Sequence, residues 1–194
     1  MKIAVTGHRP GRIRGREGEI KKWIRDTLKQ QKELNGGKVS LISGMAEGVD
    51  QIAALAALSE DIKLECYFAY KHKLSDIEQT IADKAAEALF LEDKYSGGCF
   101  LRRDRRMIED CDLLLVVWDG NPNGGTYYTY MNALEKDKPI LMFDWTNVID
   151  RLNAVPHVYP ADKKELKRGL RRATSIIEDD QINEFIGGLP HENT

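Results

Sequence analysis

Short apolar runs recur along the chain, separated by longer stretches in which apolar and polar residues mix. The runs lie at residues 2–6, 39–42, 62–68, 113–118 and 139–143. An apolar run that ends at turn-forming residues predicts a β-strand buried on both faces. The most apolar of them, Leu-Leu-Leu-Val-Val-Trp at 113–118, predicts the central strand of a parallel sheet.

The stretches between these runs carry apolar residues at helical spacing, which predicts amphipathic helices. In the stretch 17–34, for example, Ile20, Ile24 and Leu28 recur every four residues, and Asn-Gly-Gly at 35–37 ends the pattern. The predicted helices cover residues 17–34, 47–59, 76–92, 99–110 and 126–136.

Strands and helices therefore alternate, which is the pattern of an α/β protein with right-handed crossovers. We expect one doubly wound, Rossmann-like domain over residues 1–143, with a parallel sheet of about five strands flanked by helices. Residues 144–160 carry no regular pattern. Apolar positions beyond them predict a helical extension, so that residues 144–194 would pack on the domain as a C-terminal addition.

Composition narrows the possible functions. The chain has 194 residues, of which 42% are hydrophobic, and this is enough for one ordinary domain with a core. A net charge of -2 argues against a polycation that coats nucleic acid. Residues 1–38, however, hold eleven Lys or Arg against four Asp or Glu, a local charge of +7, and this asymmetry indicates an anionic ligand.

The three cysteines, Cys66, Cys99 and Cys111, are widely spaced and fit no metal-ligand pattern. We expect Cys66 and Cys111 to be small buried residues with reduced thiols, and we expect neither a metal nor a cofactor. No apolar run is long enough to cross a membrane. The sequence thus predicts a soluble, cytoplasmic protein with no membrane partner.

The loop after the first predicted strand contains Gly7, His8 and Arg9. In an open α/β sheet, ligands bind beyond the carboxyl ends of the strands, so this loop is a candidate ligand site. Gly7 allows the backbone to approach a ligand, and the Arg9 guanidinium can bind a phosphate with two hydrogen bonds. His8 is interpreted either as a wall of the pocket or as a capping contact.

The loop after the second strand runs from Ser43 through Gly44 to Gly48 and leads into a helix. Backbone N–H groups and the helix dipole favour an anion at such a helix start. Glu47 and Asp50 are predicted on one side of the first turn, either contacting a sugar hydroxyl or acting as acid or base, or only stabilising the helix.

The loop after the central strand begins at Asp119 and ends in Gly124, Gly125 and Thr126, again just before a helix. It is a second candidate phosphate-binding turn. Four arginines at 102, 103, 105 and 106 precede the same strand, and we expect some of them to reach the crevice while at least two face solvent.

Together these segments resemble the SLOG superfamily, which includes the YpsA-like group of bacteria and phages, the DNA-processing protein A family and the Lonely Guy phosphoribohydrolases. The resemblance covers residues 1–143. The motifs that carry it are Thr6-Gly-His-Arg9, Ser43-Gly-Met-Ala-Glu-Gly-Val-Asp50, Arg103 with Met107, and Gly124-Gly-Thr126. It implies a Rossmann-like fold and a nucleotide-type ligand.

The resemblance does not carry over the Lonely Guy catalytic residue. In those enzymes a Glu follows the Gly-Thr pair by three positions, where this chain has Thr129. The Arg of their Arg-Lys-x-x-Met pattern matches Arg103, but the Lys position is Asp104. A hydroxyl cannot replace a carboxylate in stabilising an oxocarbenium ion or in activating water.

Three hypotheses follow. The first is a module that binds, senses or sequesters a nucleotide-type ligand. The second is a nucleoside monophosphate N-glycosidase that uses Glu47, Asp50 or Asp119 as its catalytic carboxylate. The third is a single-stranded DNA-binding protein, suggested by the basic N-terminal part and the basic stretch 163–172. A homo-oligomer is compatible with all three, and we expect the first.

Overall fold

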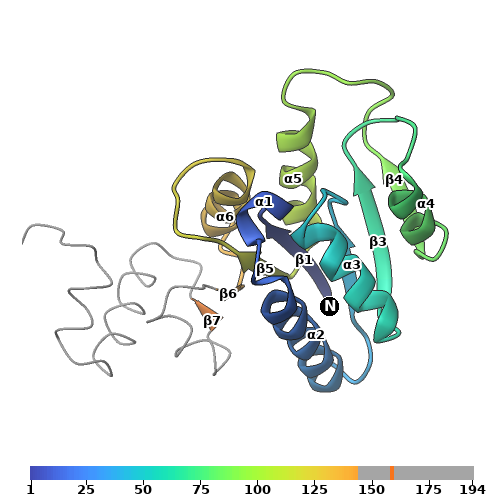
Figure 1. Cartoon of the computed structure of the whole chain (residues 1–194). Helices are drawn as coiled ribbons and strands as arrows, with labels where there is room; N and C mark the ends of the chain where they lie inside the picture. The colour runs from blue at the N-terminus through green and yellow to red at the C-terminus, as the bar shows by residue number, and fades with distance from the viewer. Residues whose placement is uncertain (144–157, 160–194) are drawn as a thin grey trace, which may run out of the picture.

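The computed structural model describes residues 1–143 and the two-residue strand at 158–159. The strands are β1 (Lys2–Gly7), β2 (Ser40–Ser43), β3 (Lys63–Phe68), β4 (Glu87–Phe90), β5 (Leu113–Val117), β6 (Ile140–Phe143) and β7 (Val158–Tyr159). The helices are α1 (Pro10–Ile13), α2 (Glu17–Leu34), α3 (Val49–Ser59), α4 (Asp76–Ala82), α5 (Cys99–Asp110) and α6 (Gly125–Glu135). Figure 1 shows their arrangement.

The strands form one sheet in the order β4-β3-β2-β1-β5-β6-β7. The first six are parallel, and β7 pairs antiparallel with β6. The chain builds outward from β1 toward β4, then returns through α5 to place β5 on the other side of β1. The strand order therefore reverses between β1 and β5, and this is the point at which an α/β sheet opens a crevice.

Alternate residues of each strand face opposite sides of the sheet, so the apolar runs supply two cores. Ile3 and Val5 of β1 belong to one core, which α2 and α3 cover, whereas Ala4 belongs to the other, which α5 and α6 cover. Burial on both faces explains why the strands are continuous apolar runs, and the expected α/β fold is confirmed.

The predicted helix at 76–92 is wrong in its second half. The helix α4 ends at Ala82, and residues 87–90 form β4, a parallel edge strand beside β3. The backbone N–H groups of Ala86 and Leu91 donate to the carbonyls of Leu64 and Phe68. The Ala- and Leu-rich sequence favours a helix locally, but the exposed edge of β3 offers hydrogen bonds that decide the outcome.

Other differences are smaller. The helix expected from residue 47 begins at Val49, which leaves Glu47 in the preceding loop rather than on the first turn with Asp50. A short helix, α1, follows Arg9 in what we expected to be loop. The strand at 158–159 falls within the stretch predicted to be irregular. The predicted C-terminal helices and the basic stretch 163–172 lie outside the described residues.

All three cysteines are buried free thiols, as expected for Cys66 and Cys111. Burial raises the pKa of Cys66 to about 12 and that of Cys111 to about 11, so neither is a reactive thiolate at neutral pH. Within the described part of the chain, no helix has the length and apolar character needed to cross a bilayer.

Candidate functional site

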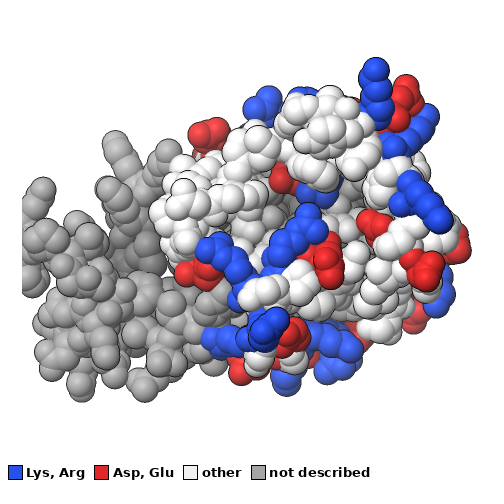
Figure 2. Space-filling model, turned by 45° about the horizontal axis from the view of Figure 1, so that its top comes forward, with Lys and Arg blue, Asp and Glu red and all other residues white. Residues whose placement is uncertain are grey.

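Two adjoining pockets open at the edge of the sheet where the parallel strands end. The first, of about 490 Å³, is lined by the turns after β1 and β5 and is called the glycine pocket. The second, of about 590 Å³, lies beyond β3 beside α4 and is called the aromatic pocket. Figure 2 tilts this edge toward the viewer and shows Lys and Arg side chains interspersed with Asp and Glu around a hollowed surface.

Gly7 lets the start of α3 approach the end of β1. A Cβ at this position would lie 2.5 Å from Cγ1 of Val49, which is too close for any side chain. The Val49 N–H then donates to the carbonyl of His8 at 3.2 Å. The first and second loops are thus tied together, and Gly7, His8 and Arg9 line the glycine pocket.

His8 is both a pocket wall and a capping partner. It is buried, and its Nε2 accepts a hydrogen bond from the Asp119 N–H at 3.0 Å while lying 2.9 Å from Oδ1 of Asp119. Burial lowers the pKa of His8, although the Asp119 charge opposes this. Burial thus favours the neutral ring, whose Nε2 accepts the amide hydrogen bond. Arg12 also approaches Asp119, at 3.4 Å, so this carboxylate is occupied by the first loop.

Arg103 crosses from α5 to the second loop. Its Nη1 donates to the carbonyl of Gly44, and its Nε and Nη2 contact Oδ1 of Asp104 at 2.9 and 2.7 Å. A Cβ on Gly44 would lie 2.7 Å from the Arg103 Cζ and 2.9 Å from Oδ2 of Asp50, so only glycine leaves room for this arrangement. Arg103 is the arginine of its cluster that reaches both pockets.

The other three arginines of this cluster lie on the outside of α5. Arg102 pairs with Glu92, Arg106 pairs with Asp110, and Arg105 donates to the Tyr128 hydroxyl at 3.2 Å. The expectation that at least two would face solvent is confirmed.

Asp50 is a buried carboxyl group at the wall of the glycine pocket. Its Oδ2 accepts the Ala46 N–H at 3.3 Å. Burial raises its pKa to about 7, with the neighbouring Asp104 adding to the effect and the charges of Arg103 and Arg9 opposing it. A carboxyl that titrates near neutrality can either donate or accept a proton there.

Ser43 and Gly48 support the pocket from behind. The Ser43 hydroxyl donates to the Asp50 carbonyl at 2.9 Å and accepts the Met45 N–H, and the side chain has no exposed surface. Gly48 has a φ of 106° and precedes α3, where a Cβ would lie 2.4 Å from the His8 carbonyl. Both shape the second loop without lining either pocket.

The start of α6 forms the far wall of the glycine pocket through Gly124, Gly125 and Thr126. The first N–H groups of a helix have no partner within the helix, and its dipole is positive at this end. Three residues later, the Thr129 hydroxyl donates to the Gly125 carbonyl at 2.9 Å and is buried. The position that would hold the Lonely Guy catalytic Glu is thus occupied by a hydroxyl turned back onto its own helix.

The aromatic pocket was not predicted from the sequence. Phe68 ends β3, and Tyr70 and His72 follow it, with ring centroids 5.1 Å apart for the Tyr70–His72 pair. Phe100 of α5 completes this wall of the pocket, with its ring centroid 6.1 Å from that of Tyr70. Its position after a parallel strand is the one sequence signal for this loop, which contains no glycine and no phosphate-binding pattern.

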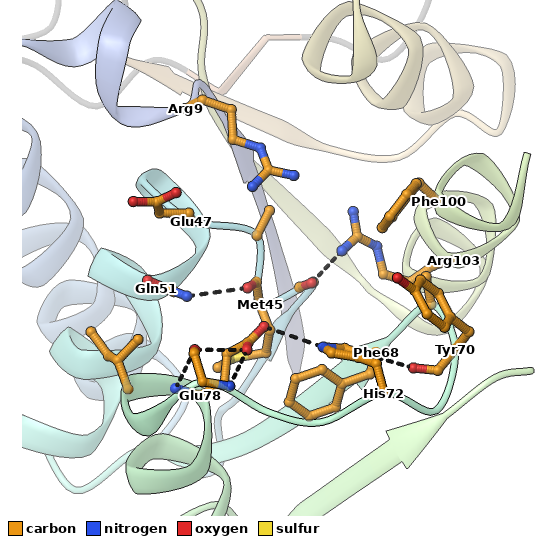
Figure 3. A pocket seen from close by; sticks show the side chains of 15 residues that line it. Arg9, Met45, Glu47, Gln51, Phe68, Tyr70, His72, Glu78, Phe100 and Arg103 are labelled. Carbon is orange, nitrogen blue, oxygen red and sulfur yellow. Dashed lines mark hydrogen bonds and ion pairs between the residues drawn. The ribbon is translucent and has the colours of Figure 1, made fainter. Parts of the chain in front are cut away.

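Arg9 and Arg103 stand where the two pockets meet (Figure 3). Their guanidinium groups point into the space from opposite sides, Arg9 from the first loop and Arg103 from α5. Glu47 lies on the exposed rim of the aromatic pocket, apart from Asp50 in the glycine pocket. The arrangement offers two cations and a helix start to an anion, beside a wall of rings.

No protein-family profile matches the sequence, and no curated protein matches it either. Solved structures are similar in fold. DNA processing protein A from Streptococcus pneumoniae superposes with a TM-score of 0.60 at 15% identity, over 86% of this chain and 60% of the other. The chain therefore spans about three fifths of that protein's length.

Two further structures show the same likeness. DNA processing protein A from Helicobacter pylori, described for its single-stranded DNA binding mode, gives a TM-score of 0.57 at 18% identity, over 92% of this chain and 81% of the other. The protein TM1055 gives 0.52 at 13% identity, over 77% and 80%. These likenesses support the Rossmann-like fold that the SLOG resemblance implied.

Proposed function

We propose that this protein binds a nucleotide-type ligand and holds its phosphate in the glycine pocket. One observation carries the proposal. The turns that follow β1 and β5, on the two sides of the strand-order reversal, line a single pocket together with Arg9 and Arg103. This is the position at which doubly wound sheets bind nucleotides.

The chemistry of the pocket suits a phosphate. The helix start at Gly124 to Thr126 presents N–H groups, and a Cβ placed on Gly124 would meet no atom within 4 Å, so the backbone there is open to a ligand. Arg9 supplies positive charge from the opposite wall, where Arg12, paired with Asp119, also lies. Asp104 lies in the same pocket, but its charge is balanced by Arg103 at 2.7 Å.

A sugar hydroxyl would meet Asp50. Of the three carboxylates proposed from the sequence, Asp119 lies near Arg12 and lines neither pocket, and Glu47 belongs to the aromatic pocket. Asp50 is the one that lines the glycine pocket. Binding without cleavage is the simpler role, because Thr129 provides no carboxylate on α6. Of the carboxylates proposed from the sequence, Asp50 is the one placed to serve a hydrolytic reaction in this pocket.

The test is a titration of the four ribonucleoside monophosphates against the wild-type protein and two matched variants. We expect Arg9→Ala to lower the affinity for the nucleotide by about tenfold or more, since a charge-assisted hydrogen bond contributes on the order of 1.5–3 kcal/mol. Arg14→Ala removes an exposed arginine of the same segment that lines neither pocket, and it should bind as the wild type does.

Absence of binding by any nucleotide at millimolar concentration would contradict the proposal, as would equal losses in Arg9→Ala and Arg14→Ala. Chromatography of the same mixtures separates binding from catalysis. Release of free base over many turnovers, abolished by Asp50→Asn, would establish the N-glycosidase instead.

A second candidate, single-stranded DNA binding, rests on exposed rings that pack against Tyr70 of the aromatic pocket. Tyr95 is 63% exposed and Phe100 44% exposed, and each packs against Tyr70. Bases stack on such rings, and the Helicobacter pylori structure is described for this type of ligand. The mixed charge of this face opposes it (Figure 2). Lack of binding to a thymidine oligonucleotide at low salt, where phosphate contacts are strongest, eliminates this candidate.

A further inference from the structure

We infer that the ligand is a dinucleotide-type small molecule, in which a phosphate link joins two ring-bearing halves and the second ring occupies the aromatic pocket. This rests on the proposed function, because it takes the first half of the ligand to lie in the glycine pocket. It adds the class of molecule that the site selects.

The size of the two pockets favours a ligand with two halves. Each pocket falls within the 300–1,000 Å³ typical of a complete small-molecule site. They adjoin each other, since Arg9, Ala46, Phe100 and Arg103 line both. A mononucleotide with its phosphate at the start of α6 would fill the glycine pocket and leave the aromatic pocket vacant.

The positive charge at the boundary between the two pockets favours a phosphate at that point. The guanidinium groups of Arg9 and Arg103 converge there from opposite sides (Figure 3). Arg103 is held in place by Gly44 and Asp104, and its guanidinium lies 5.9 Å from the centroid of the Phe100 ring. The exposed Arg9 guanidinium between the two pockets matches a phosphate link between two halves of one ligand, and the Arg103 N–H groups, held in place by Asp104, lie on the other side.

The aromatic pocket itself is built for a ring. Tyr70, half-buried, contacts His72 and Phe100, and His72 lies edge-on to Phe68 with centroids 5.9 Å apart. The His72 Nδ1 lies 2.9 Å from the Tyr70 carbonyl, which fixes the imidazole against the loop. Such a preformed wall of rings offers stacking to a planar group at low entropic cost.

The carboxylates of the aromatic pocket exclude a further phosphate. Glu78 accepts hydrogen bonds from the Ser75 N–H and hydroxyl, and Glu47 lies on the rim. A polynucleotide that continued through this pocket would bring its next phosphate beside these two carboxylates, at a cost in repulsion. A ligand that ends here in an uncharged ring and sugar avoids that cost, and this favours a small molecule over a DNA strand.

Calorimetric titration of the intact protein tests the inference. The probes are each ribonucleoside monophosphate, the matching diphosphate, and the matching symmetric dinucleoside pyrophosphate. We expect at least one dinucleoside pyrophosphate to bind about tenfold or more tightly than its monophosphate and diphosphate, because one stacked base contributes about 1–3 kcal/mol. The diphosphate separates the effect of the second ring from that of the second charge.

The variants Tyr70→Ala and His72→Ala remove rings that line the aromatic pocket and not the glycine pocket. Each should remove most of the dinucleotide advantage and leave monophosphate affinity unchanged. Tyr95→Ala is the matched control, because Tyr95 contacts Tyr70 but lines neither pocket, and it should retain the advantage.

Three other outcomes would overturn the inference. Equal affinity for the mono- and dinucleotides overturns the inference and leaves the proposed function standing. Binding of none of the probes overturns both. Competition by a thymidine oligonucleotide that is lost in Tyr70→Ala would show that the aromatic pocket serves a nucleic-acid strand, which also overturns the inference.

Discussion

Asp50 shows how one residue can link the pocket to the stability of the fold. Its carboxyl group is buried at the start of α3, where Arg103 and Arg9 oppose but do not cancel the effect of burial, and its pKa rises to about 7. In the unfolded chain the same group titrates near pH ~4. Between these values the folded protein retains a proton that the unfolded chain has released, so this residue makes the folded state less stable as pH rises from about 4 to 7.

Asp50→Asn should therefore gain stability relative to the wild type as pH increases. The amide oxygen can still accept the Ala46 N–H, but the side chain never becomes charged. We expect the difference in unfolding free energy, variant minus wild type, to grow by more than about 1 kcal/mol between pH ~4 and ~7 and to level off above that range. Urea denaturation across this range measures it.

Asp26→Asn provides the control for that titration. Asp26 is an exposed carboxylate of α2 that pairs with Lys22 at 2.6 Å. Its substitution should shift the unfolding free energy only slightly, because an exposed ion pair contributes little to stability. A difference for Asp50→Asn that does not change with pH would show that the folded protein does not retain the Asp50 proton.

The sequence predicted which loops lie at the crevice, but not which way the side chains on those loops point. Gly7, Arg9 and Asp50 line the glycine pocket, and their positions follow directly from the end of a strand. Ser43 is turned inward by hydrogen bonds to the Asp50 carbonyl and the Met45 N–H. Asp119 is held by His8, 111 residues away in the chain. Contacts of this kind depend on packing and leave no local sequence pattern.

Among the elements, α4 carries the clearest local signal. Ser75 and Glu78 form a reciprocal capping box, in which the Glu78 carboxylate accepts the Ser75 N–H at 2.8 Å and the Ser75 hydroxyl accepts the Glu78 N–H. Burial acts to raise the pKa of Glu78, but the hydrogen bonds from Ser75 and the nearby His72 outweigh it and leave the pKa below its usual value. The stabilising contribution of Glu78 is thus present at neutral pH and is lost as pH falls through that lowered pKa.

Ser75→Ala should lower the unfolding free energy by about 1 kcal/mol, because it removes one half of the box. Chemical denaturation at neutral pH measures this. Ser59→Ala is the comparison, since the Ser59 hydroxyl donates to the Ala56 carbonyl at the opposite end of a helix, and its loss should cost less. Equal effects of the two substitutions would argue against the capping box.

The helix predicted over residues 76–92 is wrong in its second half because of a contact between two elements. Ile77, Ile81, Ala85 and Leu89 are spaced as in a helix, yet Ile77 is 46% exposed and Leu89 lies in β4. Periodicity identifies a helix only where the apolar face is the one that becomes buried. The open edge of β3 is formed by residues distant in sequence, and a short strand beside it has no pattern that distinguishes it from a helical turn.

For the whole molecule, the alternation of strand and helix was sufficient to predict a doubly wound fold, because right-handed crossovers leave few arrangements. The strand count was too low, since β4 was read as helix and β7 as irregular. The position of the reversal between β1 and β5 is a property of the whole chain, and it is what brings the first and third loops into one pocket. The adjoining aromatic pocket is formed where β3, α4 and α5 come together, so no single stretch of sequence predicts it.

The most direct test of the nucleotide-binding site is a crystal structure of the protein soaked with a nucleotide that binds in solution. The account predicts a phosphate within hydrogen-bond distance of the Gly125 and Thr126 N–H groups, contacted by Arg9 from the opposite wall of the glycine pocket. A phosphate bound elsewhere on the molecule, with the glycine pocket occupied only by water, would contradict it.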